Sequence, residues 1–159
     1  MSRYFYIGLL AVVVAAGAAL FFYRTEVPSA PSDIPMRQAK FGGVSLRIEY
    51  ATTSAAREKG LSGRVSIPNA YGMLFVFPMS DYYGFWMKDM LVPLDIFWLD
   101  DQGQVVWIQK DVATSTYPNV FKPTEPARYV LETVAGFADL YQVATGTPLL
   151  LQSWPTVLK

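Results

Sequence analysis

Two reactive side chains are missing from this sequence of 159 residues, which contains no cysteine and no histidine. Without cysteine the chain has no disulfide framework, no thiol nucleophile and no zinc-thiolate cluster. Without histidine it has no Ser-His-Asp triad, no imidazole metal ligand and no side chain that titrates near neutral pH by default. Acid–base chemistry would therefore fall to Asp, Glu, Lys or Tyr, and any metal would be a hard cation held by oxygen ligands.

Charge of either sign is also scarce. The chain has 13 Lys+Arg against 13 Asp+Glu, and charged residues make up 16% of it while hydrophobic residues make up 52%. There is no basic field for nucleic acid, no glycine-rich phosphate loop and no acidic series of the EF-hand type. The sequence therefore predicts no nucleic-acid partner, no metal and no cofactor, and its length suits one soluble domain.

One long hydrophobic run stands near the start. Residues 4–23 contain no charged side chain, and as a helix they would span about 30 Å, the thickness of the hydrocarbon core of a bilayer. Aromatic residues at both ends suit the membrane interface. We expect residues 1–24 to form a transmembrane helix or uncleaved signal anchor that contacts the lipid bilayer through residues 4–23. A cleavable signal peptide is the alternative, although its apolar region is usually shorter.

The orientation of this segment is read from its flanking charges. Arg3 lies before it, whereas Arg24, Arg37 and Lys40 follow it, so the positive-inside count slightly opposes export. The short N-terminal tail with an early Arg nevertheless resembles an export signal. We therefore expect a single-pass protein of the cell membrane, with its soluble domain outside the cytoplasm.

A proline-containing stretch follows the hydrophobic run. Residues 25–40 carry three prolines among small and polar residues, which is typical of a semi-extended tether. Residues 41–159 then form the soluble domain.

Alternation of apolar and polar residues dominates this domain and predicts strands. A turn with Asp100, Asp101 and Gly103 predicts a hairpin between two of the strands. The fold class is α+β and mostly β, a single compact domain with a curved or partly closed barrel-like sheet and two short helices. The predicted strands are 44–50, 73–77, 84–87, 94–99, 104–110, 128–134 and 149–154, and the predicted helices are 54–60 and 136–143.

Five short blocks in this order carry a family resemblance. They are Gly60-Leu61, Gly72–Phe77, Phe85–Asp89, Pro93–Ile96, and Tyr129–Glu132 with Gly136. The series resembles the bacterial and archaeal family catalogued as domain of unknown function 192, over residues 44 to 151. Members of that family often follow a signal or anchor segment, which the resemblance adds to the argument for export, but it implies no reaction. Met90 departs from the pattern, since a Thr is commoner there.

Trp86 and Lys88 form the first candidate ligand site. In an extended chain they point to one side while Phe85 and Met87 point to the other. A Trp beside a Lys suits a sugar ring, a quaternary ammonium or a flat heterocycle through stacking or cation–π contact. The alternative is a core Trp86 with a solvated Lys88 at its rim.

Asp95, Glu132 and Arg57 are the other candidate ligand-binding residues. Asp95 and Glu132 stand within apolar stretches, where a carboxylate must be paired, hydrogen-bonded or functional. A structural ion pair, or acceptance of backbone N–H groups near Pro93, is the alternative for Asp95. Arg57, on the predicted short helix, is either exposed or reaches one of these carboxylates.

Two classes of function follow. The first is a membrane-anchored extracytoplasmic module that binds an envelope glycan, a peptide or a protein partner. The second is a small hydrolase or lyase that uses Asp95 and Glu132, since two carboxylates about 5–10 Å apart suffice for glycoside chemistry. The motif residues would have only a structural role in a third case. The sequence leaves open whether the chain is an enzyme, and it assigns no catalytic residue.

Overall fold

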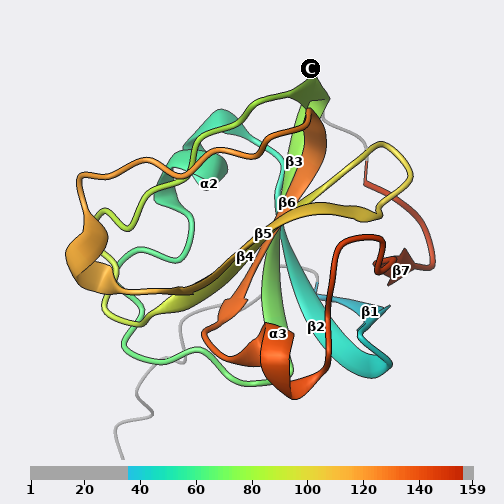
Figure 1. Cartoon of the computed structure of the whole chain (residues 1–159), viewed down its shortest axis with the longest axis horizontal. Coiled ribbons are helices and arrows are strands. Elements are labelled where there is room, and N and C mark those ends of the chain that lie inside the picture. The colour runs from blue at the N-terminus through green and yellow to red at the C-terminus, as the bar shows by residue number, and fades with distance from the viewer. Residues whose placement is uncertain (1–35, 156–159) are drawn as a thin grey trace, which may run out of the picture. The chain divides into compact units, whose positions relative to one another are not determined.

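A seven-stranded sheet dominates the computed structural model, which describes residues 36–155 (Figure 1). The strand order is β5-β4-β6-β3-β2-β1-β7, and neighbours are antiparallel except for β2 and β3, which pair in parallel. The strands are β1 Arg37–Phe41, β2 Val44–Ala51, β3 Tyr71–Asp81, β4 Leu94–Leu99, β5 Val105–Val112, β6 Ala127–Val134 and β7 Leu150–Leu151. The short helices are α2 Ser54–Lys59, η1 Thr114–Thr116 and α3 Phe137–Leu140.

The C-terminal segment links the two edges of this sheet. The Val105 N–H at the start of β5 donates to the Thr147 carbonyl at 3.0 Å, and the Leu149 N–H donates to the Gly103 carbonyl at 2.9 Å. The next two residues form β7, which pairs with β1 at the other edge. The sheet is therefore curled into a half-barrel, which confirms the prediction of a mostly-β domain with a curved sheet and two short helices.

The sheet carries a hydrophobic core on each face. The first face contains Leu74, Phe97 and Leu131 and is covered by α3 and the chain that follows it. The second face contains Phe75, Trp98 and Val130. Buried side chains of residues 61–67 and 85–90 cover this second face, and α2 adds the partly buried Ala56. Alternation within each strand thus supplies both cores, because successive side chains project from opposite faces.

The structure departs from the sequence predictions at three elements. The last predicted strand, 149–154, is reduced to the two residues of β7. Strand β1 includes residues 37–40, which were expected to belong to the tether. Residues 84–87 were predicted as a strand, but within them only Phe85 makes a β-bridge, to Phe121. The in–out alternation of that segment still holds, since Phe85 and Met87 are buried while Trp86 and Lys88 are exposed.

The predicted transmembrane helix at residues 1–24 lies outside the described residues, as does most of the tether. Between residues 36 and 155, no helix has the length and apolar character that crossing a membrane requires.

Candidate functional site

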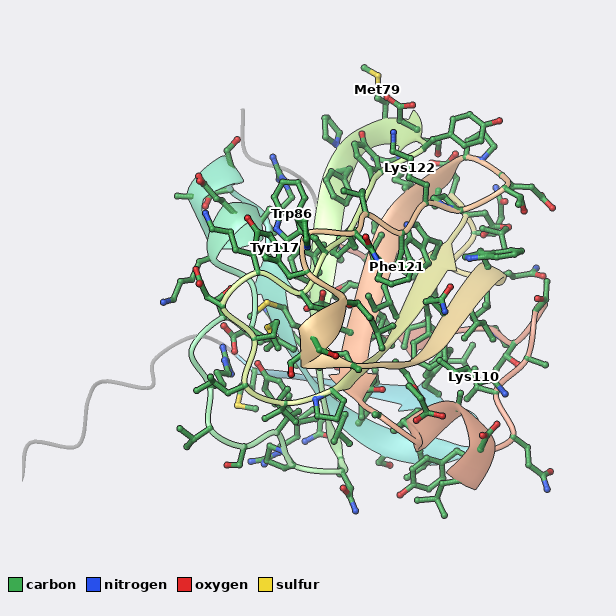
Figure 2. The ribbon with its side chains drawn as sticks, turned by 60° about the vertical axis from the view of Figure 1, so that its left-hand side comes forward. Met79, Trp86, Lys110, Tyr117, Phe121 and Lys122 are labelled. Carbon is green, nitrogen blue, oxygen red and sulfur yellow. The ribbon has the colours of Figure 1, made fainter. Side chains whose placement is uncertain are left out.

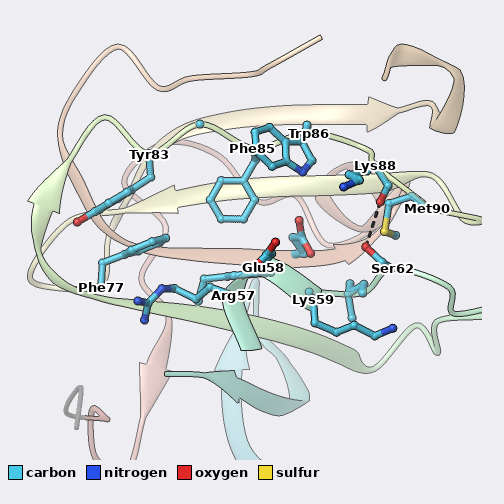
Figure 3. A pocket seen from close by; sticks show the side chains of 15 residues that line it. Arg57, Glu58, Lys59, Ser62, Phe77, Tyr83, Phe85, Trp86, Lys88 and Met90 are labelled. Atoms are coloured by element: carbon cyan, nitrogen blue, oxygen red, sulfur yellow. Dashed lines mark hydrogen bonds between the residues drawn. The ribbon is translucent and has the colours of Figure 1, made fainter. Parts of the chain in front are cut away.

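A pocket of about 340 Å³ opens on the second face of the sheet, between α2 and residues 83–90 (Figure 3). Thr53 caps α2 by accepting the Ala56 N–H at 3.1 Å, and the helix ends at Gly60, whose φ is 49°. This short helix brings three consecutive charged residues, 57–59, to the pocket. The opposite wall is held in place by a backbone pairing in which Phe85 and Phe121 exchange two hydrogen bonds of 2.9 and 2.8 Å.

Aromatic side chains form one end of the pocket. The rings of Phe77 and Tyr83 stack with centroids 3.5 Å apart, and Phe85 meets Phe75 edge to face at 4.8 Å. Figure 3 shows Phe85 and Trp86 along one wall, with Lys59, Ser62, Lys88 and Met90 gathered at the other end. Ser62 donates to the Lys88 carbonyl at 3.0 Å, which joins the segment after α2 to the opposite wall.

Glu132 is the buried polar residue of this pocket. It lies on the inner strand β6, between Met73 of β3 and Ile96 of β4, and is only 4% exposed. Within residues 36–155 its carboxyl group makes no side-chain hydrogen bond and no ion pair. Burial raises the pKa of Glu132 to about 8, against the weaker opposing effect of the Arg64 charge. The carboxyl group is therefore largely protonated at neutral pH.

A second carboxylate lies on the same face but is already occupied. Glu49 of β2 pairs in register with Met73, which in turn pairs with Glu132. Its carboxylate accepts a hydrogen bond from Arg64 at 2.8 Å and another from the Tyr71 hydroxyl. Burial and the bond to Glu49 raise the pKa of Tyr71 well above its ordinary value. The contrast with Glu132 is clear, because Glu49 has two partners within the domain.

Asp95 does not lie in the pocket. It is fully buried on the first face and accepts backbone N–H groups from Asp111 at 2.8 Å and Ala138 at 2.7 Å. The second bond fixes the start of α3, and the first holds Asp111, whose φ is 49°. This arrangement corresponds to the structural alternative for Asp95, with the N–H donors coming from β5 and α3.

Arg57 lines the pocket without reaching a carboxylate. Its guanidinium donates to the carbonyls of Thr52 at 2.9 Å and Val76 at 3.0 Å, and lies over the Phe77 ring at 5.2 Å. Trp86, labelled in Figure 2, and Lys88 also line the pocket, and the Trp86 side chain is 51% exposed. Four of the five sequence candidates thus meet around one pocket: Arg57, Trp86, Lys88 and Glu132.

Several pocket residues were not singled out from the sequence. Phe77 and Tyr83 form the stacked pair, and Lys59 and Ser62 follow from the way α2 ends. Phe77 ends the apolar run 73–77, but nothing local in the sequence places it against Tyr83. Met90, at the position where the family more often has Thr, also lines the pocket, so this chain presents a thioether there.

Comparisons with known proteins place the chain in an uncharacterised family. Residues 37–151 match the family DUF192, described as uncharacterised ACR. A UPF0127 protein of Thermococcus gammatolerans is 31% identical over 114 residues, which cover 70% of this chain and 69% of the relative.

Two crystal structures share the fold. A protein of Sinorhizobium meliloti 1021, described as a candidate transcription regulator, superposes with a TM-score of 0.68 at 28% identity and covers 72% of this chain and 92% of its own. A protein of unknown function from Novosphingobium aromaticivorans superposes with a TM-score of 0.66 at 27% identity, covering 79% and 90%.

The fold and site define a half-barrel domain with an aromatic pocket on its second face and a buried carboxyl group inside that pocket. The chain belongs to the family of domain of unknown function 192, as the block pattern in the sequence predicted.

Proposed function

We propose that this chain is a membrane-anchored, extracytoplasmic binding module and that the pocket between α2 and residues 83–90 holds a small ligand. One observation carries the proposal: Glu132, buried in the pocket, has no partner among the described residues. The carboxyl group lines the pocket and bonds to no other side chain there, so its oxygens are open to a hydrogen bond with a bound molecule. A ligand group that hydrogen-bonds to Glu132 would supply the missing partner.

The walls of the pocket support a ligand with a ring. Phe77, Phe85 and Trp86 present apolar faces beside a few polar groups, the usual composition of small-molecule sites. A volume of about 340 Å³ suits a molecule of one or two rings. The hydrolase alternative loses its proposed residue pair, because Asp95 is bound to backbone N–H groups on the other face of the sheet.

The anchoring part of the proposal rests on the sequence of residues 4–23, twenty residues without a charge. Reporter fusions at the C-terminus test it directly. An alkaline phosphatase fusion should be active and a green fluorescent protein fusion dark, because the first folds only outside the cytoplasm and the second fluoresces inside it. The reverse pattern would refute the proposed localisation.

The binding part is tested by a fragment screen of the full-length chain, purified in detergent and followed by thermal unfolding. A ligand at 100 times its Kd should stabilise the domain by about 2.7 kcal/mol. The effect should disappear in Trp86→Ala and persist in the control Leu140→Ala. Trp86 is 51% exposed in the pocket, whereas Leu140 is 64% exposed on α3. No stabilising fragment, or hits that Trp86→Ala leaves unchanged, would refute a ligand site here.

A further inference from the structure

The charge around the pocket is mainly positive. Arg57, Lys59 and Lys88 line it, while Glu58 is the one acidic residue besides Glu132. In the described part of the chain, Lys59 and Lys88 form no ion pair, and both are exposed. Two free ammonium groups at the end opposite the stacked aromatic pair would attract an anion and disfavour a cation.

The buried carboxyl group of Glu132 also favours an acidic ligand over a basic one. A neutral carboxylic acid is a hydrogen-bond donor, whereas a carboxylate only accepts. Ligand oxygens, in a carbonyl, carboxylate, phosphate or hydroxyl group, could accept from a protonated Glu132. An ammonium ligand could bond to the acceptor oxygen of a neutral Glu132, but an ion pair would require Glu132 to ionise within apolar surroundings, and Lys59 and Lys88 would repel the ammonium.

Resting on the proposed binding function, we infer that the pocket takes a small ring-containing acid. The ring packs against Phe77, Phe85 and Trp86, the anionic group lies toward Lys59 and Lys88, and a ligand oxygen accepts a hydrogen bond from Glu132. Carboxylate and phosphate would both satisfy this arrangement, because each offers negative charge and acceptor oxygens.

Ligand affinity should then depend on the protonation of Glu132. The charged and titratable groups around Glu132 come from several elements. Glu49 of β2 lies on the same face with its partners Arg64 and Tyr71. The pocket adds the α2 residues Arg57, Glu58 and Lys59, and Lys88 on the opposite wall. Strands β3 and β4 contribute only Met73 and Ile96 as the direct neighbours of Glu132 in register. Arg64 and Tyr71 are engaged with Glu49, so Glu132 remains the group that titrates near pH 8.

Six probes in two matched sets test the inference by calorimetric titration of the full-length chain in detergent. Benzoate, benzylamine and benzyl alcohol share one ring, and glucose 6-phosphate, glucosamine and glucose share another. Each set thus contains one acid, one amine and one neutral molecule. At pH 6.5, in at least one set, the acid should bind at least tenfold more tightly than the other two probes. Lys88→Gln should weaken that acid about three- to tenfold, while Lys40→Gln, an exposed lysine on β1, should not change it.

Two variants of Glu132 test whether this residue acts on the ligand as a hydrogen-bond donor or as a charged counter-ion. Glu132→Gln keeps an N–H donor and should hold the affinity within about threefold, whereas Glu132→Ala should lose it. Between pH 7 and pH 9.5 the affinity of the wild type for the acid should fall about 30-fold, because a group with a pKa of about 8 loses its proton over that range. In Glu132→Gln this fall should be absent.

Three results would overturn the inference. The first is tightest binding of an amine with an affinity that rises with pH, and the second is tightest binding of a neutral probe. The third is no binding of any acid. In each case the fragment screen decides the wider question, because hits sensitive to Trp86→Ala keep the proposed binding function while the ligand class is rejected. An empty screen rejects both.

Discussion

Glu132 and Asp95 lie on the adjacent strands β6 and β4 yet project from opposite faces of the sheet. Glu132 pairs in register with Ile96, and Asp95 pairs with Thr133, the next residue along β6. The two acids are thus offset by one residue in register and project from opposite faces. Glu132 lies in the pocket without a side-chain partner, whereas Asp95 lies in the other core and accepts two backbone N–H groups. The two acids that look alike in the sequence have different roles for this geometric reason.

Replacing Asp95 should unfold the protein more easily. Asp95→Asn leaves one carbonyl oxygen and turns an N–H donor toward a backbone N–H, so at least one of the two bonds is lost. We expect a loss of about 2–3 kcal/mol in the free energy of unfolding, measured by urea titration. The control is Asp139→Asn on α3, whose pairing with Lys110 is exposed to solvent and should contribute much less than the two Asp95 bonds. Equal losses in the two variants would contradict the structural role of Asp95.

Glu132 should make the stability fall as the pH rises. Its pKa is raised from an ordinary 4.5 to about 8, so between these values the folded state binds more protons than the unfolded state. The stability associated with the proton is complete below pH 4.5 and is lost as the pH rises to about 8. The loss has an upper limit of about 5 kcal/mol.

Glu132→Gln tests this dependence, because glutamine has the same shape and does not titrate. Urea unfolding from pH 5 to pH 9 should show the variant more stable than the wild type above pH 7, with the two curves converging toward pH 5. Curves that stay parallel across this range would show that Glu132 is not a protonated buried acid.

Arg64 should tune this transition. Its charge lowers the pKa of Glu132, so Arg64→Met should move the loss of stability to higher pH, while Arg64→Lys should leave it closer to the wild type. Both variants also weaken the contact to Glu49, which is why the position of the transition on the pH axis, rather than the total stability, is the quantity to compare. An unchanged position in Arg64→Met would exclude coupling between the two side chains.

Two glycines with the same φ of 78° separate backbone strain from steric overlap. A Cβ at Gly103 would lie 2.1 Å from the ring of Trp154, whereas a Cβ at Gly43 meets no atom within 4 Å. Gly43→Ala should cost about 1–2 kcal/mol for the left-handed backbone. Gly103→Ala should cost a further 1–3 kcal/mol, about the cost of overpacking. Equal losses in thermal unfolding would mean that Trp154 does not pack on the β4–β5 turn.

The sequence predicted most of the fold because alternation is a local signal. Strands 44–50, 94–99 and 128–134 were placed within one or two residues, and the hairpin turn at Gly103 was recognised. Strand β1 was missed because residues 37–41 follow three prolines and contain two basic residues, while what makes them a strand is pairing with both β2 and β7. Such pairing is set by distant parts of the chain.

The pocket was predicted only in part. Alternation in β6 placed Glu132 on the same face as Val130, and alternation in residues 85–88 placed Trp86 opposite Phe85. The segment 84–87 is not a strand, because it is held by a single bridge to Phe121 rather than by a ladder. The face of the sheet from which Asp95 projects depends on the register between β4 and β6. The sequence alone does not show this register.

The protonation state of Glu132 is the most direct test of the account. The measurement is a pH titration of the ¹³C chemical shift of the Glu132 side-chain carboxyl group, assigned by comparison with Glu132→Gln. A midpoint near pH 8 is the expected result for a buried acid without a partner in the domain. A midpoint near 4.5, the ordinary value, would show that the carboxyl group is solvated or paired and would contradict both the pocket chemistry and the inferred ligand class.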